Sequence, residues 1–497
     1  FDNIDEELDG WLIKSENYQA LNTLSFKYNE RIQCIYIDPP YNTNSSPIIY
    51  VNNYKHSSWL TLMQNRIEIS KKLLKPNGIN IVAIDDVELR YLITLLDNIF
   101  GQDNYITTIT TECNPQGRVS NKVSKTTEFH ILHAKNINNI QEIYVNKIGN
   151  KKPKPLKRTG TNSRREERPN RYYPILIKDN KIFMIQEEEY KNIYNATSKM
   201  FNDDFVEFIR QKYENLGYNF VLPIGENGEK LVWQRTFERV NKEKENYIVK
   251  DNSIFTPSFD KEIPKTLWKD SIFSNPEYGS EYLKHILGSS VFETPKSLHT
   301  IKQFFSIFDS KGVYLDYFGG SGTTAEAIIK LNQEDDGERK YIIVELGDHI
   351  YSVIIPRIKK ICFTDKWQEG MAQDGQGVSQ FFKYYELEQY EDVLRNAKYE
   401  HGDLTLQPSP GKDVFNEYIF MRSPKFVEAV LKREGNEYKV DLSKIYPEKR
   451  IDIAETLSNV LGKKIRKISK ESFELEDIGK IRYDNIPVEY IKPLIWW

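Results

Sequence analysis

Cysteine is scarce and widely spaced in this chain of 497 residues. Its three cysteines, Cys34, Cys113 and Cys362, form no CxxC pair. A disulfide framework or a cysteine zinc site is therefore not expected, and a reducing cytoplasm fits. The chain also lacks the run of ~18 apolar residues that a membrane span needs, and its acidic start, FDNIDEELDG, lacks a signal-peptide pattern. These absences favour a cytoplasmic protein.

A large excess of charge of one sign is also missing. The formal net charge is −3, with 39% hydrophobic and 28% charged residues, which is typical of a soluble globular protein. Any surface for nucleic acid must therefore be a local patch. Because domains usually have about 100–200 residues, roughly two to four units are expected.

Apolar runs and helical periodicity alternate in the first part of the chain. Strands are predicted over 32–37, 79–84 and 129–134. Helices are predicted over 58–74, before the stop signal 75-KPNG-78, and over about 86–99, starting at the acids Asp85, Asp86 and Glu88. This alternation predicts an α/β fold with a doubly wound, mostly parallel sheet. Glu128 only precedes a predicted strand and is given no chemical role.

The alternation fades in the middle of the chain and returns later. Between Lys147 and Arg171 there are ten Lys or Arg residues against two acids, with several prolines, so a loop-rich insert is predicted. The α/β pattern resumes at 313–332 and at a predicted strand over 340–346, and an amphipathic helix is predicted over 451–468. The predicted segments are 1–138, 139–285, 286–368 and 369–497, the last an α+β domain.

The stretch 316-DYFGGSG-322 joins a predicted strand to a predicted helix. Glycines let a backbone approach a ligand, and the start of a helix offers free N–H groups. Glu345 ends the next predicted strand, where such folds hold ribose hydroxyls. No lysine follows the glycines, which excludes a P-loop. The turn predicts an adenosine-type cofactor; a dinucleotide fold, or a turn required by packing alone, remain the alternatives.

The stretch 34-CIYIDPPYNTN-44 ends a predicted strand in an acid, two prolines and an aromatic residue. Such a turn can simply cap a strand. It also suits methylation of an exocyclic amine, whose lone pair is conjugated into the base. The carboxylate of Asp38 and the carbonyl of Pro39 can accept both amine hydrogens, Pro40 stiffens the loop, and Tyr41 offers a face for an extruded base.

Together these motifs resemble the amino-methylating DNA methyltransferases that use S-adenosylmethionine, and DPPY resembles the adenine-N6 members. The catalytic motif precedes FGGSG, as in their β group. The resemblance implies a Rossmann-like seven-stranded sheet, a catalytic half (1–138), a target-recognition insert (139–285) and a cofactor-binding half (286–368). In it, 292-FETPKS-297 is similar to a cofactor-side Pro-Lys element. The implied cofactor residues are Asp316, Phe318, Gly319, Gly320, Ser321, Gly322, Glu345 and Lys296.

Other stretches resemble the Mod subunits of type III restriction–modification systems. They are 54–67, 161–175, 381–392 and 452–465. This resemblance implies a homodimer that methylates one adenine of a short site in double-stranded DNA and joins a Res helicase–nuclease subunit. The resemblance also implies that the segment 369–497 makes the contacts with the partner subunit or within the dimer. The residues predicted to contact DNA are Arg164, Arg165, Arg168, Lys151 and Lys152.

Several alternatives stay open from the sequence. The basic run is also consistent with a solvated loop. The chain is also consistent with an orphan methyltransferase without a nuclease partner, or with a catalytically silent DNA-binding module. Related xPPY loops occur in enzymes that methylate RNA or protein glutamine. No spacing of residues indicates a metal site.

Overall fold

The computed structural model describes residues 2–42, 56–117, 123–147, 155–225, 227–250, 253–256, 261–387, 431–434, 437–440, 452–487 and 489–490. The chain forms two compact units, one from Phe1–Val145 with Ile263–Trp497 and the other from Asn146–Glu262. The second unit is one continuous stretch that falls inside the predicted insert 139–285; the four predicted segments stay a prediction. Among the described residues, no helix is long and apolar enough to cross a membrane.

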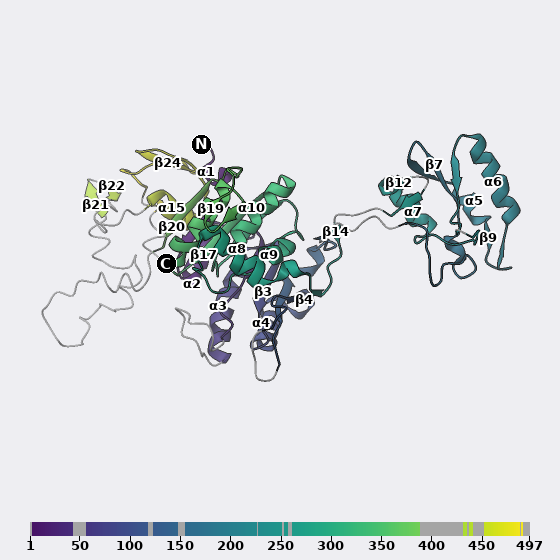
Figure 1. The fold of residues 1–497 in the computed structure, drawn as a ribbon. Helices are drawn as coiled ribbons and strands as arrows, with labels where there is room; N and C mark the ends of the chain where they lie inside the picture. The colour runs from purple at the N-terminus through teal and green to yellow at the C-terminus, as the bar shows by residue number, and fades with distance from the viewer. Residues whose placement is uncertain are drawn as a thin grey trace. The chain divides into compact units, whose positions relative to one another are not determined.

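The first unit is built on a nine-stranded sheet (Figure 1). Every neighbouring pair is parallel except those that β5 makes with β3 and β4. The doubly wound, mostly parallel class is thereby confirmed. The sheet exceeds the implied seven strands because short strands extend both edges. The order is β15 (Leu267–Trp268), β4 (Tyr105–Glu112), β5 (Thr127–Ala134), β3 (Leu74–Ile84), β2 (Ile32–Ile37), β16 (Lys311–Asp316), β17 (Glu338–Glu345), β1 (Gly10–Lys14) and β20 (Phe382–Glu386).

Helices cover both faces of this sheet. Successive side chains of a strand point to opposite faces, and β2 follows this rule. Ile35 and Ile37 pack in one core with apolar residues of α2, α3 and α4. Tyr36 lies on the other face, with its ring centroid 6.0 Å from that of Phe305 in α9, beside which α10 packs. The bounds are α2 Asn17–Leu24, α3 His56–Leu73, α4 Leu89–Phe100, α9 Leu298–Phe305 and α10 Thr323–Asp335.

Two predicted boundaries near the first strands are wrong. The stop signal 75–78 is part of β3, which starts at Leu74 directly after α3. The acids predicted for the first turn of the second helix precede α4. Asp85 instead accepts the backbone N–H of Val87, and Glu88 occupies the N-cap position with its side chain fully buried. The side chain of Glu88 makes no capping hydrogen bond to α4, and its contacts lie instead at the candidate active site.

The predicted helix 451–468 is also wrong in its second half. Helix α15 runs from Ile453 to Leu461 and ends at Gly462, which adopts a left-handed conformation with φ +64°. The chain then turns into β23 (Ile465–Ile468), which pairs antiparallel with β24 (Ser472–Leu475), itself paired with β25 (Gly479–Arg482). A glycine at the helix end thus separates a helix from a strand with the same apolar content.

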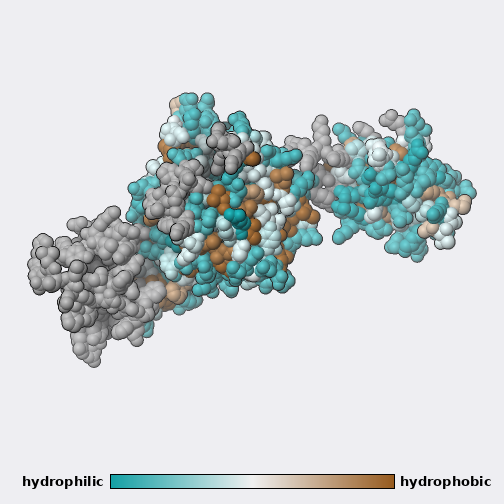
Figure 2. All heavy atoms as spheres, turned by 90° about the horizontal axis from the view of Figure 1, so that it is seen from below, coloured by the Kyte–Doolittle hydropathy of each residue, from teal (hydrophilic) through white to brown (hydrophobic). Residues whose placement is uncertain are grey.

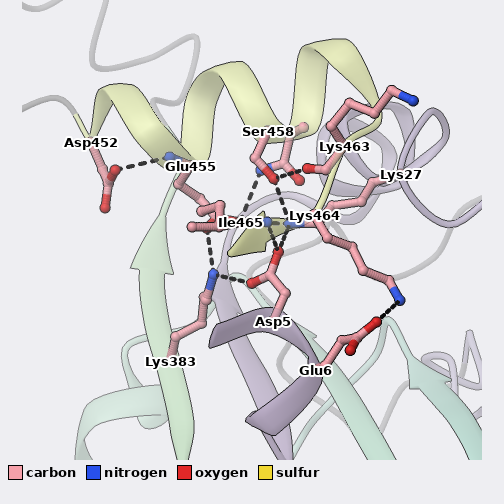
Figure 3. A network of polar contacts seen from close by, with 11 residues as sticks. Asp5, Glu6, Lys27, Lys383, Asp452, Glu455, Ser458, Lys463, Lys464 and Ile465 are labelled. Atoms are coloured by element: carbon pink, nitrogen blue, oxygen red, sulfur yellow. Dashed lines mark hydrogen bonds and ion pairs between the residues drawn. The ribbon is translucent and has the colours of Figure 1, made fainter. Parts of the chain in front are cut away.

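A ring of buried ion pairs joins this C-terminal segment to the start of the chain (Figure 3). Asp5 in α1 (Ile4–Glu7) accepts from Lys27 Nζ at 2.7 Å and from Lys383 Nζ at 2.8 Å. Glu455 in α15 lies 2.6 Å from Lys383 Nζ and 3.7 Å from Lys27 Nζ. We call Asp5, Lys27, Lys383 and Glu455 the Asp5 cluster. It contains two carboxylates and two ammonium groups, so its formal charge is balanced.

The second unit has a core of its own, although a loop-rich insert was expected. Antiparallel strands β7 (Ile175–Lys178), β8 (Lys181–Met184) and β11 (Asn219–Val221) pack with α6 (Asp203–Asn215) and α7 (Phe237–Glu243). Aromatic residues contribute to this core beside the aliphatic ones; the rings of Tyr190 and Phe237, for example, stack at 4.2 Å between centroids. The face of this unit seen in Figure 2 is mostly hydrophilic.

Candidate active site

Three acids lie at the carboxyl ends of adjacent parallel strands. Asp38 follows β2, Asp316 ends β16 and Glu345 ends β17. Strand β16 pairs with both of its neighbours in parallel. The two sequence motifs, far apart along the chain, therefore meet at one edge of the sheet, where open α/β folds bind their ligands.

The predicted catalytic residues Asp38, Pro39, Pro40 and Tyr41 form the loop after β2. The buried indole of Trp59 in α3 donates a hydrogen bond to the carbonyl of Pro40 at 2.9 Å. Tyr41 is partly buried against the same core as β2. The loop is thus fixed by a helix of the core in addition to its two prolines.

Lys296 lies against this loop, although the sequence assigned it to the cofactor. Its Nζ is 3.2 Å from Asp38 Oδ1 and 2.8 Å from Glu128 Oε2, and it donates to the Tyr41 hydroxyl. Nζ also lies 4.7 Å from the centroid of the Tyr41 ring. We call Asp38, Tyr41, Glu128 and Lys296 the Asp38 cluster.

The Asp38 cluster has two carboxylates and a single ammonium group. Burial raises the pKa of Asp38, Lys296 lowers it, and the carboxylate of Glu128 raises it again, with a net upward shift. The pKa of Lys296 is also raised, because the two carboxylates outweigh its burial. The site therefore carries a net negative charge that costs free energy when nothing positive lies beside it.

The glycine turn is shaped by the acids around it. The backbone N–H of Gly320, which has φ +54°, donates to Glu345 Oε2 at 2.8 Å. A side chain at Gly319 would come within 2.5 Å of Ile343, so only glycine fits there. Asp316 accepts from the Thr324 hydroxyl at 2.6 Å and from the N–H of Phe318 at 3.0 Å. Burial, with Asp38 and Glu345 nearby, raises the pKa of Asp316 to about 7.

A buried ion pair packs against the glycine turn and stabilises it. Arg357 Nε lies 2.6 Å from Glu326 Oε2, and both side chains are fully buried. Arg357 also donates to the carbonyl of Ser321 at 3.0 Å and to Thr323 Oγ1 at 2.9 Å. The predicted cofactor residue Ser321 thus turns its hydroxyl inward, and Gly322 with φ +77° starts α10. Any role of Ser321 with a ligand would involve its backbone.

Sequence reasoning missed the buried acids and the tryptophan around the catalytic loop. Glu88 Oε1 accepts from Asn42 Nδ2 at 2.8 Å and lies 2.7 Å from His56 Nδ1. Asn42 directly follows Tyr41 and has φ +57°. The DPPYNT run and the helix pattern were visible, but nothing in the sequence pairs them with Glu88, Trp59 or Glu128.

The predicted DNA-contacting residues differ in their surroundings. Arg165 is paired with Asp203, with Nη1–Oδ1 at 2.6 Å and Nη2–Oδ2 at 3.0 Å, and its guanidinium lies 4.2 Å from the Phe201 ring centroid. The side chain of Arg164 is exposed, and Arg168 lies at the start of the turn Pro169–Arg171. Lys151 and Lys152 lie outside the described residues.

A group of arginines gathers around Arg171 in the second unit. The carbonyl of Arg171 accepts from Trp233 N, and its Nη1 donates to the carbonyl of Gln234, both at 2.9 Å. The N–H of Arg158 donates to the carbonyl of Val232, the residue directly before Trp233. Burial and the neighbouring guanidiniums lower the pKa of Arg171. We call Arg158, Arg168, Arg171 and Arg235 the arginine group.

A sequence model of the DNA methylase family matches residues 32–356. The match begins with β2 and includes the DPPY loop, Lys296, the glycine turn and β17. It covers well over half of the chain, and the chain therefore belongs to this family.

Individual relatives are more specific. The chain is 30% identical over 396 residues to the Mod subunit of the type III restriction–modification enzyme EcoPI from Escherichia phage P1, which covers 68% of this chain and 58% of that subunit. It is 28% identical to the probable HindVI Mod subunit of Haemophilus influenzae over 77% of this chain and 54% of that one. It is 30% identical to the type II methyltransferase M.KpnI of Klebsiella pneumoniae over 66% of this chain and 79% of that enzyme.

The chain thus spans little more than half the length of the two Mod subunits. Among solved structures, it is similar to the complex of M1.HpyAVI with SAM (TM-score 0.33, 13% identity, 70% of this chain and 98% of that one). It is also similar to the cytosine-N4-specific PvuII DNA methyltransferase (TM-score 0.37, 13% identity, 73% of this chain and 89% of that one).

Proposed function

We propose that this chain transfers a methyl group from S-adenosylmethionine to the N6 amine of adenine in double-stranded DNA. The observation that carries the proposal is the meeting of Asp38, Asp316 and Glu345 at one edge of the sheet. An amine acceptor site and a nucleoside-binding site are then adjacent, as a direct transfer between two bound molecules requires.

The cofactor site has the chemistry that S-adenosylmethionine needs. Glu345, at 14% exposure, has a carboxylate that can accept from ribose hydroxyls. Asp316 is a buried acid whose pKa is raised by burial and by the neighbouring carboxylates, so a cation beside it would offset their repulsion. When bound, S-adenosylmethionine supplies a methyl group as a sulfonium, and its sulfur keeps the electron pair of the broken C–S bond.

The DPPY loop supplies the groups that act on the base. The carboxylate of Asp38 and the carbonyl of Pro39 accept the two amine hydrogens, which frees the nitrogen lone pair for the new C–N bond. Trp59 holds the following carbonyl, of Pro40, and so fixes the loop. Tyr41 stacks on the extruded base. The nitrogen sheds one proton after transfer, along its hydrogen bond to Asp38 and on to water.

Adenine is the favoured base for two reasons. The motif begins with Asp38, whereas cytosine-N4 enzymes more often carry serine there. The relatives with the highest coverage of this chain include Mod subunits of type III systems.

We further propose that the arginine group contacts DNA phosphates or guanine edges. Its guanidiniums come from three segments of the second unit and lower the pKa of Arg171 between them, so an anion would relieve their repulsion. We leave Arg165 out of this group because its guanidinium already pairs with Asp203. Arg164 and Arg168 stay candidates; DNA in the cytoplasm is the expected partner.

Two assemblies are consistent with this chemistry. As a type III Mod subunit, the chain would form a homodimer and join a Res helicase–nuclease subunit, as the similarity to the EcoPI subunit suggests. A second candidate is a methyltransferase that acts without a nuclease partner. It is favoured by the higher share of M.KpnI that the chain covers, 79% against 58% of the EcoPI subunit. Co-purification with a large ATPase favours the first assembly; an active chain without one favours the second.

Transfer of labelled methyl groups tests the proposal. Unmethylated plasmid DNA is incubated with the chain and S-[methyl-³H]adenosylmethionine, then digested to nucleosides. We expect N6-methyl-2′-deoxyadenosine from the unsubstituted chain and none from Asp38→Ala, which should still bind the cofactor. Label in N4-methyl-2′-deoxycytidine, or undiminished transfer by Asp38→Ala, contradicts the proposal. Single-molecule sequencing of the product identifies the methylated site.

A further inference from the structure

We infer that Lys296 is a positioning residue for the DPPY loop, with Glu128 as its buried counter-charge, and that it does not bind the cofactor. This inference rests on the proposed methyl transfer. It reassigns a lysine that the sequence placed with the glycine turn, and it gives a function to an acid to which the sequence assigned none.

The contacts of Lys296 define its role. An ammonium group has three N–H donors. Here Nζ forms an ion pair with Asp38 Oδ1 at 3.2 Å, and it donates hydrogen bonds to the hydroxyl of Tyr41 and to Glu128. The first two are the amine acceptor and the stacking ring of the proposed site. Lys296 is only 8% exposed, so these contacts are shielded from water. One side chain therefore fixes the carboxylate and the ring relative to each other.

Lys296 is itself held in place by contacts of its backbone and of its counter-charge. Asn275 Nδ2 lies 3.4 Å from Glu128 Oε2, and Asn275 Oδ1 accepts the backbone N–H of Ser297 at 2.8 Å. Because Ser297 follows Lys296 directly, Asn275 connects the counter-charge to the backbone of the lysine. Four residues before Lys296, the Phe292 ring centroid lies 5.4 Å from that of His349, whose Nε2 is 3.2 Å from Glu345 Oε1. The segment 292–296 thus runs from the cofactor side to the catalytic side, and its lysine lies at the catalytic end.

The charges of the cluster match the reaction. Methyl transfer moves a positive charge from sulfur to the amine nitrogen, and the net negative cluster lies where that charge arrives. Lys296 and Glu128 act on the pKa of Asp38 in opposite directions, downward and upward. Among the described residues, the other titratable groups that interact with the cluster include Tyr36, Cys113, His130 and Asp316.

Because Lys296 and Glu128 shift the pKa of Asp38 in opposite directions, the pH dependence of the transfer rate distinguishes a positioning role from a purely structural one. Asp38 must be ionised to accept the amine hydrogens, so the transfer rate falls as pH falls through its pKa. Lys296→Met should move this acidic limb of the single-turnover pH–rate profile to higher pH. Glu128→Gln, a nearly isosteric change, should move the limb to lower pH.

Affinity for the cofactor separates positioning from cofactor binding. For Lys296→Met we expect a rate about 100-fold lower, the size of effect that misplacement of a catalytic group produces. Calorimetry with S-adenosylmethionine should give an unchanged Kd, which also establishes that the variant is folded. Lys284→Met is the matched control, because Lys284 in α8 (Tyr282–Leu287) is half exposed and, among the described residues, forms its ion pair with nearby Glu281. The rate and Kd of this variant should equal those of the unsubstituted chain.

Each other result has a definite meaning. A weakened Kd with an unchanged rate at saturating cofactor would return Lys296 to the cofactor site and overturn the inference. Acidic limbs that stay in place in both variants would also overturn it, while leaving the proposed function intact. Absence of transfer by the unsubstituted chain would overturn the proposed function and this inference together.

Discussion

The Asp5 cluster and the Asp38 cluster both hold two carboxylates against lysine, yet the pKa of their aspartates shifts in opposite directions. Burial alone would raise the pKa of Asp5, but Lys27 and Lys383 outweigh it and the pKa is lowered. In the Asp38 cluster one lysine faces two acids, and the pKa of Asp38 is raised. With two lysines for two acids, the buried carboxylate stabilises the fold. With one lysine for two acids, it would be stabilised further by a bound cation.

The Asp5 cluster is closed by contacts within the protein. Asp5 Oδ2 also accepts the backbone N–H of Ile465 at 2.8 Å, and Lys27 donates to Ser458 Oγ at 2.7 Å. Both partners belong to the C-terminal segment (Figure 3). The Asp38 cluster lies instead at the carboxyl edge of the sheet, with Asp38 27% exposed. Changes in the Asp5 cluster, which is closed by contacts within the protein, should therefore affect stability. Changes in the Asp38 cluster, which is open at the edge of the sheet, should affect catalysis.

Removal of one cation from the Asp5 cluster should have the largest effect. Lys27→Met leaves two buried carboxylates with one lysine, which should lower the free energy of unfolding by about 3–5 kcal/mol. Chemical denaturation measures this change. The control is Lys467→Met, whose partner Asp2 is exposed; it should leave the free energy of unfolding unchanged. Equal stability of the two variants would contradict the difference drawn between closed and open clusters.

Neutralising the two aspartates separates stability from activity. Asp38→Asn removes an ionised group that the fold disfavours and leaves Lys296 paired with Glu128, so the melting temperature should stay the same or rise. Methyl transfer should fall about 100-fold or more. Asp5→Asn should do the reverse, lowering the melting temperature with the rate per folded molecule retained. Thermal melts and single-turnover assays of both variants check this; a destabilised Asp38→Asn would argue against an open cluster.

Two groups should make the free energy of unfolding depend on pH, Asp5 at acidic pH and Asp316 up to about pH 7. The lowered pKa of Asp5 means that its contribution is present above the ordinary aspartate pKa and is lost as pH falls below it. The pKa of Asp316, raised to about 7, has the opposite sign: its contribution is lost as pH rises from the ordinary value to about 7. Denaturant titrations of the cofactor-free chain should show that Asp316→Asn reduces the second slope, to which the raised pKa of Asp38 also contributes, and keeps the first.

The same distinction predicts a smaller effect in the second unit. Arg168→Ala should weaken DNA binding and reduce the dependence of log Kd on log salt by about 1, as expected for one lost phosphate contact. Arg165→Ala, which breaks a pair with Asp203, should lower the stability of this unit and leave the salt dependence unchanged. Fluorescence anisotropy over a range of salt concentrations distinguishes the two. Interchanged results would assign the DNA contact to Arg165.

The acids at the strand ends were predictable because parallel strands place their carboxyl ends together. DPPY and FGGSG carry their own local signals, and β2, β16 and β17 place them at one edge. Glu128 was not predictable. It lies at the start of β5, which runs antiparallel to β3, so that its first residues reach the same edge as the ends of β2 and β3. Strand direction depends on pairing across the sheet, which no local pattern contains.

Other errors have local causes. The helix predicted over 451–468 ended early because Gly462 adopts a conformation that closes helices, and the apolar residues after it suit a strand equally well. The basic run 147–171 predicted a surface for DNA, which stays a prediction, and folding brings the carboxylate of Asp203, at the start of α6, to Arg165. Charge counts along a sequence do not include partners that folding brings in.

The second unit, Asn146–Glu262, is a single uninterrupted stretch with its own apolar core, whereas the catalytic edge is assembled from segments on both sides of it. If this unit reads the DNA sequence, one continuous gene segment encodes the sequence specificity. Recombination between related genes at the two ends of that segment would change the recognised DNA sequence in one event and leave every catalytic residue in place. New methylation patterns would then arise without any change to the catalytic residues.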